Sequence, residues 1–201
     1  MTPELVRRLA ARGVFVLALA LIWVLAMQLR EARARFADLA QRYREPHPGM
    51  YVPTVAASDL AAHSVLIGDS TPGARQLVFV FTTECPYCRA SLPAWSRLAA
   101  AAESMRSPPV RVLGVSLSAL DSTRAYATEH HLAFPIVRFP EHKLVYVYRS
   151  QTVPVTMVIE APGRVVYAHV GQLTDTLIED SLLAALRMRL TATDSTASRK
   201  E

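Results

Sequence analysis

Cysteine is scarce in this chain: among 201 residues only Cys85 and Cys88 carry a thiol, three positions apart. Such a pair could be a structural staple, half of a metal site, or a redox couple that opens and closes. A zinc or copper site needs further soft ligands, and there is no third cysteine. The histidines after residue 53 follow no ligand spacing; they are His63, His130, His131, His142 and His169. These absences argue against a bound metal.

The chain also lacks a basic surplus outside its N-terminal segment. Its formal net charge is +5 at pH 7. Residues 1–45 hold eight arginines and four acidic residues, which gives 8 − 4 = +4 and leaves +1 for the rest. The basic character therefore belongs to the N-terminus, and a nucleic-acid partner is not expected.

One long uncharged stretch, residues 13–29, lies between Arg12 and Arg30. A helix of 17 residues spans about 25 Å, near the short end of the range for a membrane crossing. A buried helix is one alternative, and a cleaved signal peptide with small residues at 18–20 is another. The apolar run continues beyond that point, which favours an uncleaved transmembrane signal anchor and a lipid-bilayer partner.

The arginines do not orient this span, because three precede it and five follow it. A short N-terminal tail, residues 1–12, before a long domain is nevertheless the usual form of a signal anchor. Long domains also translocate largely regardless of charge. We therefore expect a single-pass cell-membrane protein whose domain lies on the extracytoplasmic (periplasmic) side.

Four regions follow the predicted anchor. Residues 30–45 are predicted as a charged helical stalk, and the proline-rich residues 46–53 as a linker, so that residues 30–53 together separate anchor and domain. Residues 54–190 are predicted as one domain. The small, polar residues 191–201 are predicted to be a disordered tail.

Strand-like and helix-like segments alternate within this domain. Short, continuous apolar runs predict buried strands. The predicted strands are residues 76–81, residues 110–118, and two strands within residues 153–171 around a turn at 161–163. The predicted helices are residues 85–105, 121–131 and 175–190. This order predicts an α/β fold, with a central mixed β-sheet flanked by helices on both faces.

Cys85 lies at the junction of a predicted strand and a predicted helix, with Pro86 at the first helical position. The free N–H groups and the positive end of the helix dipole favour the thiolate form of Cys85. Cys88 lies one turn further on, near enough to form a disulfide with little backbone motion. That bond would close a tiny loop and constrain the unfolded chain little, which disfavours a structural staple and favours a redox couple.

The strand, the CPYC motif at residues 85–88 and the following helix together resemble the thioredoxin superfamily. Pro93 lies where thioredoxin-like proteins commonly kink this helix. Residues 152–159 resemble the superfamily's cis-proline segment, with Pro154 facing the cysteines. The long separation of Cys88 from Pro154 resembles the membrane-anchored TlpA/ResA/CcmG-like branch. A thioredoxin-like fold after one N-terminal transmembrane helix is what this resemblance implies.

The resemblance implies a protein thiol–disulfide oxidoreductase that needs neither cofactor nor metal. Its catalytic residues would be Cys85, which attacks the substrate disulfide, and Cys88, which resolves the mixed disulfide. The expected partners are exported proteins that carry disulfides and an unidentified membrane protein that donates electrons. Reduction of the substrate disulfide is the favoured direction, and cytochrome c maturation is one process in which it would occur. The residues expected to bind substrate are Pro86, Tyr87, Val153 and Pro154.

Several positions depart from the pattern of this branch. Glu84 and Tyr87 replace the tryptophan before the first cysteine and the proline before the second. The buried acid of thioredoxin falls on Phe79, and the glutamate of ResA-like proteins falls on Ser91. The usual proton acceptor for Cys88 is therefore missing, and Glu84 is the one candidate to replace it.

Two other functions share parts of the motif. A peroxiredoxin is suggested by Thr82 three positions before Cys85, but Val78 replaces the upstream proline of that motif. A Sco-like copper metallochaperone also has an anchor and a Cys-Pro start, but its cysteines are spaced one residue wider. Such a protein also needs a distant histidine, and Val153 and Pro154 occupy the relevant loop. Dithiol exchange fits the adjacent cysteines better than either alternative.

Overall fold

The computed structural model describes residues 3–68, 73–106 and 109–187, so the predicted tail, residues 191–201, lies outside the described residues. The chain divides into two compact units, Met1–Tyr43 and Arg44–Glu201.

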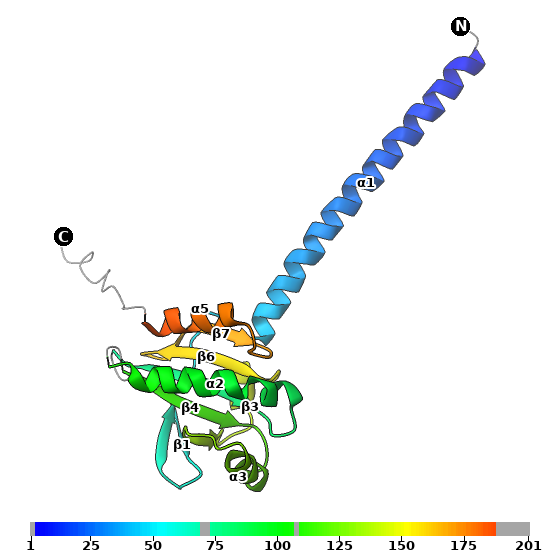
Figure 1. Ribbon diagram of the computed structural model, residues 1–201. Coiled ribbons are helices and arrows are strands. Elements are labelled where there is room, and N and C mark those ends of the chain that lie inside the picture. Colours follow the sequence, from blue (N-terminus) through cyan, green and yellow to red (C-terminus); the bar gives the residue numbers. More distant parts are fainter. Residues whose placement is uncertain (1–2, 69–72, 107–108, 188–201) are drawn as a thin grey trace, which may run out of the picture. The chain divides into compact units, whose positions relative to one another are not determined.

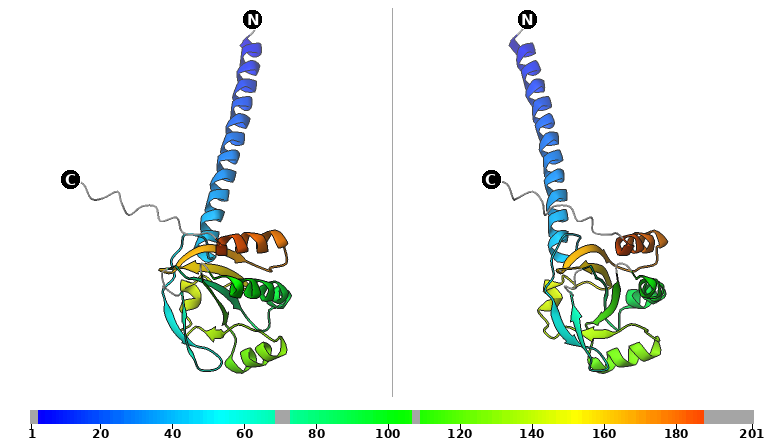
Figure 2. Two further views of the ribbon diagram at one scale, coloured as in Figure 1. Left: turned by 60° about the vertical axis from the view of Figure 1, so that its left-hand side comes forward. Right: turned by 90° about the vertical axis from the view of Figure 1, so that its left-hand side faces the viewer.

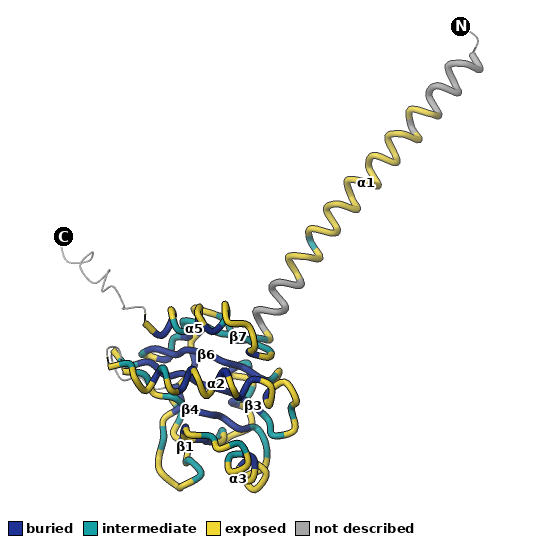
Figure 3. Tube along the Cα trace, viewed as in Figure 1, coloured by how far each residue is buried: buried dark blue, intermediate teal, exposed yellow. Residues whose placement is uncertain are grey.

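The first unit consists of helix α1 (Pro3–Arg44) (Figure 1). Within the described residues, α1 alone is long and apolar enough to cross a membrane, over Phe15–Phe36. Apart from the half-buried Ala32, the described side chains of this stretch are exposed, among them Phe15 and Trp23. Figure 3 shows α1 coloured almost entirely as exposed where it is described. None of the apolar window is buried, which disfavours the alternative of a buried core helix. The same helix continues through the predicted stalk residues as far as Arg44.

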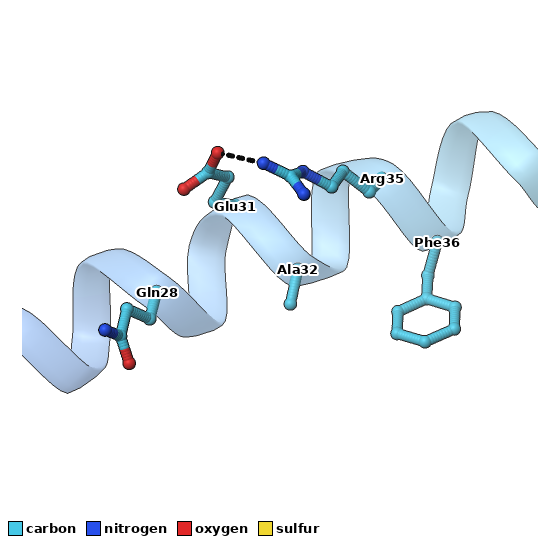
Figure 4. A pocket seen from close by; sticks show the side chains of 5 residues that line it. All are labelled: Gln28, Glu31, Ala32, Arg35 and Phe36. Atoms are coloured by element: carbon cyan, nitrogen blue, oxygen red, sulfur yellow. Dashed lines mark hydrogen bonds and ion pairs between the residues drawn. The ribbon is translucent and has the colours of Figure 1, made fainter.

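A hollow along α1 is lined by Gln28, Glu31, Ala32, Arg35 and Phe36 (Figure 4). Arg35 Nη2 donates to Glu31 Oε1 at 2.5 Å, one helical turn apart. Both side chains are largely exposed, so this pair contributes little to stability. All of the lining belongs to one helix, and no thiol is among it.

The second unit contains a five-stranded mixed sheet with the strand order β5-β4-β3-β6-β7. The strands β3, β4 and β5 are parallel, whereas β6 runs antiparallel to both β3 and β7. The strands are β3 (Arg75–Phe81), β4 (Val110–Ser116), β5 (Ile136–Arg138), β6 (Val155–Glu160) and β7 (Arg164–Val170). The predicted α/β class with a central mixed sheet is confirmed.

One face of the sheet is covered by helices. Leu77, Phe79 and Phe81 of β3 belong to a hydrophobic cluster on this face. Its other members come mainly from three helices: α2 (Pro86–Ser104), α3 (Leu120–Glu129) and α5 (Thr176–Arg187). Figure 2 shows α2 and α5 on the side of the sheet away from the β1 hairpin. Because β3 is buried on both faces, its residues 77–81 form a continuous apolar run in the sequence.

The opposite face differs from the prediction of helices on both faces. Val78 and Val80 pack there in a cluster with residues of a two-stranded hairpin and a single turn of helix. These elements are β1 (Val55–Ser58), β2 (Ser64–Ile67) and α4 (Leu144–Val147). Each has only four residues. So short an element shows little periodicity, which is why the sequence did not predict any of them.

Residues 46–53, which the sequence predicts as a linker, belong to the second unit and pack within it. Met50 and Val52 are buried, with 8% and 3% of their surface exposed. Val52 N donates to Gly163 O at 2.9 Å. Gly163 has φ +93°, and a Cβ there would lie 2.2 Å from Val52 O, so this contact requires glycine. Helix α1 ends at Arg44, just before the prolines, as expected. The extended backbone that follows packs against the sheet and is not an exposed linker.

Candidate active site

Cys85 caps the N-terminus of α2. Its backbone is extended, and Pro86 occupies the first helical turn. The Cys85 sulfur accepts a hydrogen bond from the backbone N–H of Cys88 at 3.2 Å. This N–H is one of the unpaired donors of the helix start, so the sulfur lies where a negative charge is stabilised. The predicted strand–cysteine–helix junction is confirmed.

Cys88 differs sharply from Cys85 in its surroundings. Both are free thiols, but Cys88 is fully buried, whereas Cys85 is partly exposed. Burial, followed by the hydrogen bond to Cys85, raises the pKa of Cys88 from 9.0 to about 12. One sulfur can therefore meet a substrate, and the other is held back as a protonated thiol. No group of three or more potential metal ligands occurs in the part of the chain that the structure describes.

The Val153–Pro154 peptide bond is cis, as predicted. The Cys85 sulfur lies 3.9 Å from the carbonyl oxygen of Val153, which is 68 positions later in the sequence. The predicted proximity of this segment to the cysteines is confirmed. The backbone of Val153 is thus beside the reactive sulfur, where an extended polypeptide could pair with it.

Two of the expected substrate-binding side chains lie on the surface beside Cys85. Pro86 is exposed, and 60% of the Tyr87 surface is accessible. The loop before them is held to the segment that follows β4, because Thr83 N donates to Ser118 Oγ at 3.0 Å. Ser118 was not singled out in the sequence, since a single serine after a strand carries no distinguishing pattern.

Ser91 occupies the position where ResA-like proteins have a glutamate, and it is fully buried. Its hydroxyl donates to Tyr87 O at 2.8 Å and accepts from Leu173 N at 2.9 Å. The hydroxyl therefore ties the first turn of α2 to the segment before α5. The sequence revealed the missing acid at this position but not the structural role of the serine that replaces it.

An aromatic layer supports the cysteines from within the core. Trp95 of α2 is buried and stacks on Phe79, with ring centroids 5.0 Å apart. The indole N–H of Trp95 donates to Thr156 Oγ1 at 3.0 Å, which satisfies its one polar group. Phe79, at the position of thioredoxin's buried acid, is thus part of an apolar support and offers Cys88 no proton acceptor.

Within the described structure, no carboxylate forms a hydrogen bond with Cys88. Glu84 is exposed, and no hydrogen bond among the described residues joins it to Cys88. The Tyr126 hydroxyl is a buried polar group whose pKa depends on that burial and on the charge of Cys88. Burial and, second, the charge of Cys88 raise the pKa of Tyr126 to about 12. This hydroxyl has no hydrogen-bond partner among the described residues, and the Tyr126 ring contacts His130 with centroids 4.4 Å apart.

Comparisons with known proteins agree with this geometry. A family model described as Redoxin matches residues 47–186, most of the chain. The search of curated proteins finds no match.

Three solved structures illustrate the structural similarity. A putative thiol:disulfide interchange protein DsbE from Chlorobium tepidum has 22% identity and a TM-score of 0.60, covering 69% of this chain and 97% of its own. StoA from Bacillus subtilis has 20% identity and a TM-score of 0.56, covering 68% and 98%. The thioredoxin domain of a thiol-disulfide oxidoreductase from Bacteroides vulgatus has 17% identity and a TM-score of 0.59, covering 71% and 99%. The predicted thioredoxin-like fold is confirmed.

Proposed function

Because the chain belongs to the Redoxin family and is a thioredoxin-like thiol–disulfide oxidoreductase, we propose that it reduces disulfides of exported proteins at a membrane. The observation that supports this proposal is the pairing of a partly exposed Cys85 with a buried Cys88 whose backbone N–H donates to the Cys85 sulfur. One sulfur can meet a large substrate, and the other can reach only the first sulfur.

The reaction follows from this difference between the two thiols. The Cys85 thiolate attacks one sulfur of the substrate disulfide, and the other substrate sulfur leaves as a thiolate that takes up a proton. Cys88 then loses its proton and attacks the Cys85 sulfur, which releases the second substrate thiol. Two electrons have moved to the substrate, and the protein holds a Cys85–Cys88 disulfide. Another dithiol protein at the membrane must reduce this disulfide before the next cycle.

The direction of electron flow is argued from magnitudes. The Cys85 sulfur accepts from the Cys88 N–H at 3.2 Å, at the start of a helix. A helix start in general favours a thiolate, and hence the reduced form of a dithiol protein. A dipole contribution of about 0.3–1 kcal/mol raises the potential by about 6–20 mV. Moving from a thioredoxin-like −270 mV to a strongly oxidising −120 mV takes about 7 kcal/mol. The helix start therefore falls far short of making a strong oxidant, which favours reduction.

The location of the proposed reaction follows from the N-terminal segment. The apolar stretch Phe15–Phe36 is compatible with a single-pass anchor. A domain exported beyond this anchor would meet disulfides in the oxidising extracytoplasmic compartment, where exported proteins form them. Cysteines of apocytochrome c are one class of substrate that such a protein would keep reduced.

The reduction potential of the full-length protein in detergent micelles tests the direction. Equilibration with dithiol buffers, followed by alkylation of free thiols, should give a value near −270 mV. The Cys88→Ser variant should accumulate a mixed disulfide with substrate, because the buried resolving thiol is missing. The matched Cys85→Ser variant should form none.

Three results would contradict the proposal. A potential near −120 mV with rapid oxidation of reduced, unfolded proteins would indicate an oxidase. Mixed disulfides in the Cys85→Ser variant would reverse the roles of the two cysteines. Consumption of peroxide without any disulfide substrate would indicate a peroxidase.

A further inference from the structure

A hollow of about 450 Å³ lies at the ends of β4 and β5 and beside α4. This volume is within the range of ligand-binding clefts. The residues that matter for its chemistry are Ser116, Arg138, Phe139, His142, Tyr146 and Gln151. None of them was singled out as a binding residue in the sequence, and none takes part in the exchange steps described above.

This hollow, hereafter the β5–α4 hollow, adjoins the reactive cysteine. Ser116, which lines it, pairs in register with Phe81, the last residue of the strand that leads to Cys85. Gln151, another lining residue, lies two residues before Val153, whose carbonyl is 3.9 Å from the Cys85 sulfur. Two residues of extended chain span at most about 7 Å. A polypeptide bound across Val153 would therefore extend within reach of the hollow.

The side chains lining the β5–α4 hollow that can carry a charge near neutral pH are all basic. Arg138 and His142 contribute to its lining, and no carboxylate does. The Arg138 side chain is exposed, and no ion pair engages it within the described chain. Glu141 lies in sequence between two lining residues, Pro140 and His142, but it forms an ion pair elsewhere: its Oε2 is 2.6 Å from Lys143 Nζ. An unpaired guanidinium in an open hollow favours a carboxylate ligand.

Aromatic contacts hold the walls in place. Phe139 packs against Tyr148 with ring centroids 4.9 Å apart. Tyr148 is fully buried, and its hydroxyl donates to Pro53 O, so that this wall is fixed to the core. His142 packs edge-on against Tyr146, with centroids 5.9 Å apart, and 59% of Tyr146 is exposed. The hollow thus combines a rigid wall with an exposed aromatic ring that can cover the stem of a bound side chain.

We propose that the β5–α4 hollow binds an acidic side chain of the substrate polypeptide, with Arg138 as the residue that recognises its carboxylate. This inference deepens the proposed function, on which it rests, by naming a class of substrate. The protein would favour substrates whose reacting cysteine has aspartate or glutamate within a few residues. Arg138 selects the substrate in this proposal and takes no part in the exchange of disulfides.

The test compares two peptide disulfides, each a homodimer of a one-cysteine peptide. Glutamates flank the cysteine in the acidic peptide, and glutamines replace them in the amide peptide. The reduced full-length protein, in nonionic detergent, reduces each peptide disulfide, and the second-order rate constant is measured. Each rate constant is then divided by the one for reduction of the same peptide by dithiothreitol. This division removes differences in intrinsic reactivity. The acidic-to-amide ratio should be about threefold to fivefold for the wild type, and it should shrink in 0.5 M salt.

Three variants locate the effect. Arg138→Gln should bring the ratio to about 1, whereas Arg138→Lys, which keeps the charge, should retain most of the preference. Arg106→Gln is the matched control, because Arg106 is also exposed and follows the far end of α2, so it should leave the ratio unchanged. A ratio near 1 in the wild type, retention of the preference in Arg138→Gln, or its loss in Arg106→Gln would each overturn the proposed subsite.

Measurement in both directions separates this inference from the proposed function. Oxidised protein is therefore also mixed with the two reduced peptides, since both directions pass through the same mixed disulfide. Equal rates for both peptides in the reducing direction would overturn the subsite and leave the proposed function standing. Failure to reduce either peptide, together with preferential oxidation of the acidic one, would support the subsite and overturn the proposed direction. Absence of exchange in both directions would overturn both.

Discussion

The unequal burial of the two thiols predicts how fast each reacts with an alkylating agent. Cys88 is fully buried, and its pKa is raised from 9.0 to about 12, with burial as the main cause. At pH 8 about one Cys88 side chain in 10,000 is then a thiolate, compared with about one in ten for a cysteine of pKa 9.0. Thiolate abundance alone thus slows Cys88 by about a thousandfold, since 12 − 9 = 3.

The assay is a timed reaction of the reduced full-length protein with iodoacetamide, quenched and mapped by mass spectrometry. At pH 8 Cys85 should be labelled first, and Cys88 about a thousandfold more slowly than a short cysteine peptide. The labelling of Cys88 should accelerate about tenfold per pH unit between pH 8 and 11. The peptide should level off above about pH 9, because its thiol is by then ionised.

Two controls make this result interpretable. In denaturant, Cys85 and Cys88 should be labelled at similar rates. In the Cys85→Ser variant, the hydrogen bond that contributes to the raised pKa of Cys88 is altered while burial remains, so labelling should be faster than in the wild type but slower than in the peptide. Equal labelling of both thiols of the folded protein at pH 8 would refute the reasoning.

Two substitutions and one membrane extraction test other parts of the structure. Ser91→Ala should lower the free energy of unfolding by about 1–3 kcal/mol in urea titrations, because Leu173 N–H loses its buried acceptor; an unchanged midpoint would contradict this. Tyr126→Phe should leave stability unchanged or raise it by about 1 kcal/mol, since its buried hydroxyl has no partner among the described residues; a loss above 1 kcal/mol would reveal a bond made in solution. The full-length protein should stay with membranes after carbonate washing, as expected of an uncleaved apolar helix; release of a shortened form would indicate cleavage.

Much of the fold could be predicted from local pattern. The strand β3 and the helices α2 and α5 combine long apolar stretches with clear boundaries, and each lies within a few residues of its predicted range. The missed elements β1, β2 and α4 have four residues each, and β5 has three. Their positions depend on tertiary packing against the sheet, which leaves no periodic signal in so few residues.

The chemistry of the cysteines could be predicted, but not the environment that distinguishes them. Spacing and the strand–helix junction placed Cys85 at a helix start. The cis peptide bond and the proximity of Val153 to Cys85 were expected from the resemblance to the thioredoxin superfamily. The hydrogen bond between Ser91 and Leu173 joins residues 82 positions apart. Tyr126, whose pKa is raised by burial and by the charge of Cys88, lies 126 − 88 = 38 positions from that cysteine, and no sequence pattern encodes either meeting. Glu84 as proton acceptor stays a prediction.

The packing of residues 46–53 on the sheet decides where a soluble fragment of this protein can begin. A fragment that starts at residue 54 would lack Met50 and Val52 and leave Gly163 O without its donor. Full burial of a valine or methionine side chain is worth about 1.5–3 kcal/mol, so two of them make up a large share of a typical stability of about 5–15 kcal/mol. Cleavage just after Tyr43 would keep both, because the second compact unit begins at Arg44. A fragment that begins at Arg44 should therefore keep these contacts and fold stably, whereas one that begins ten residues later, at residue 54, should be markedly less stable.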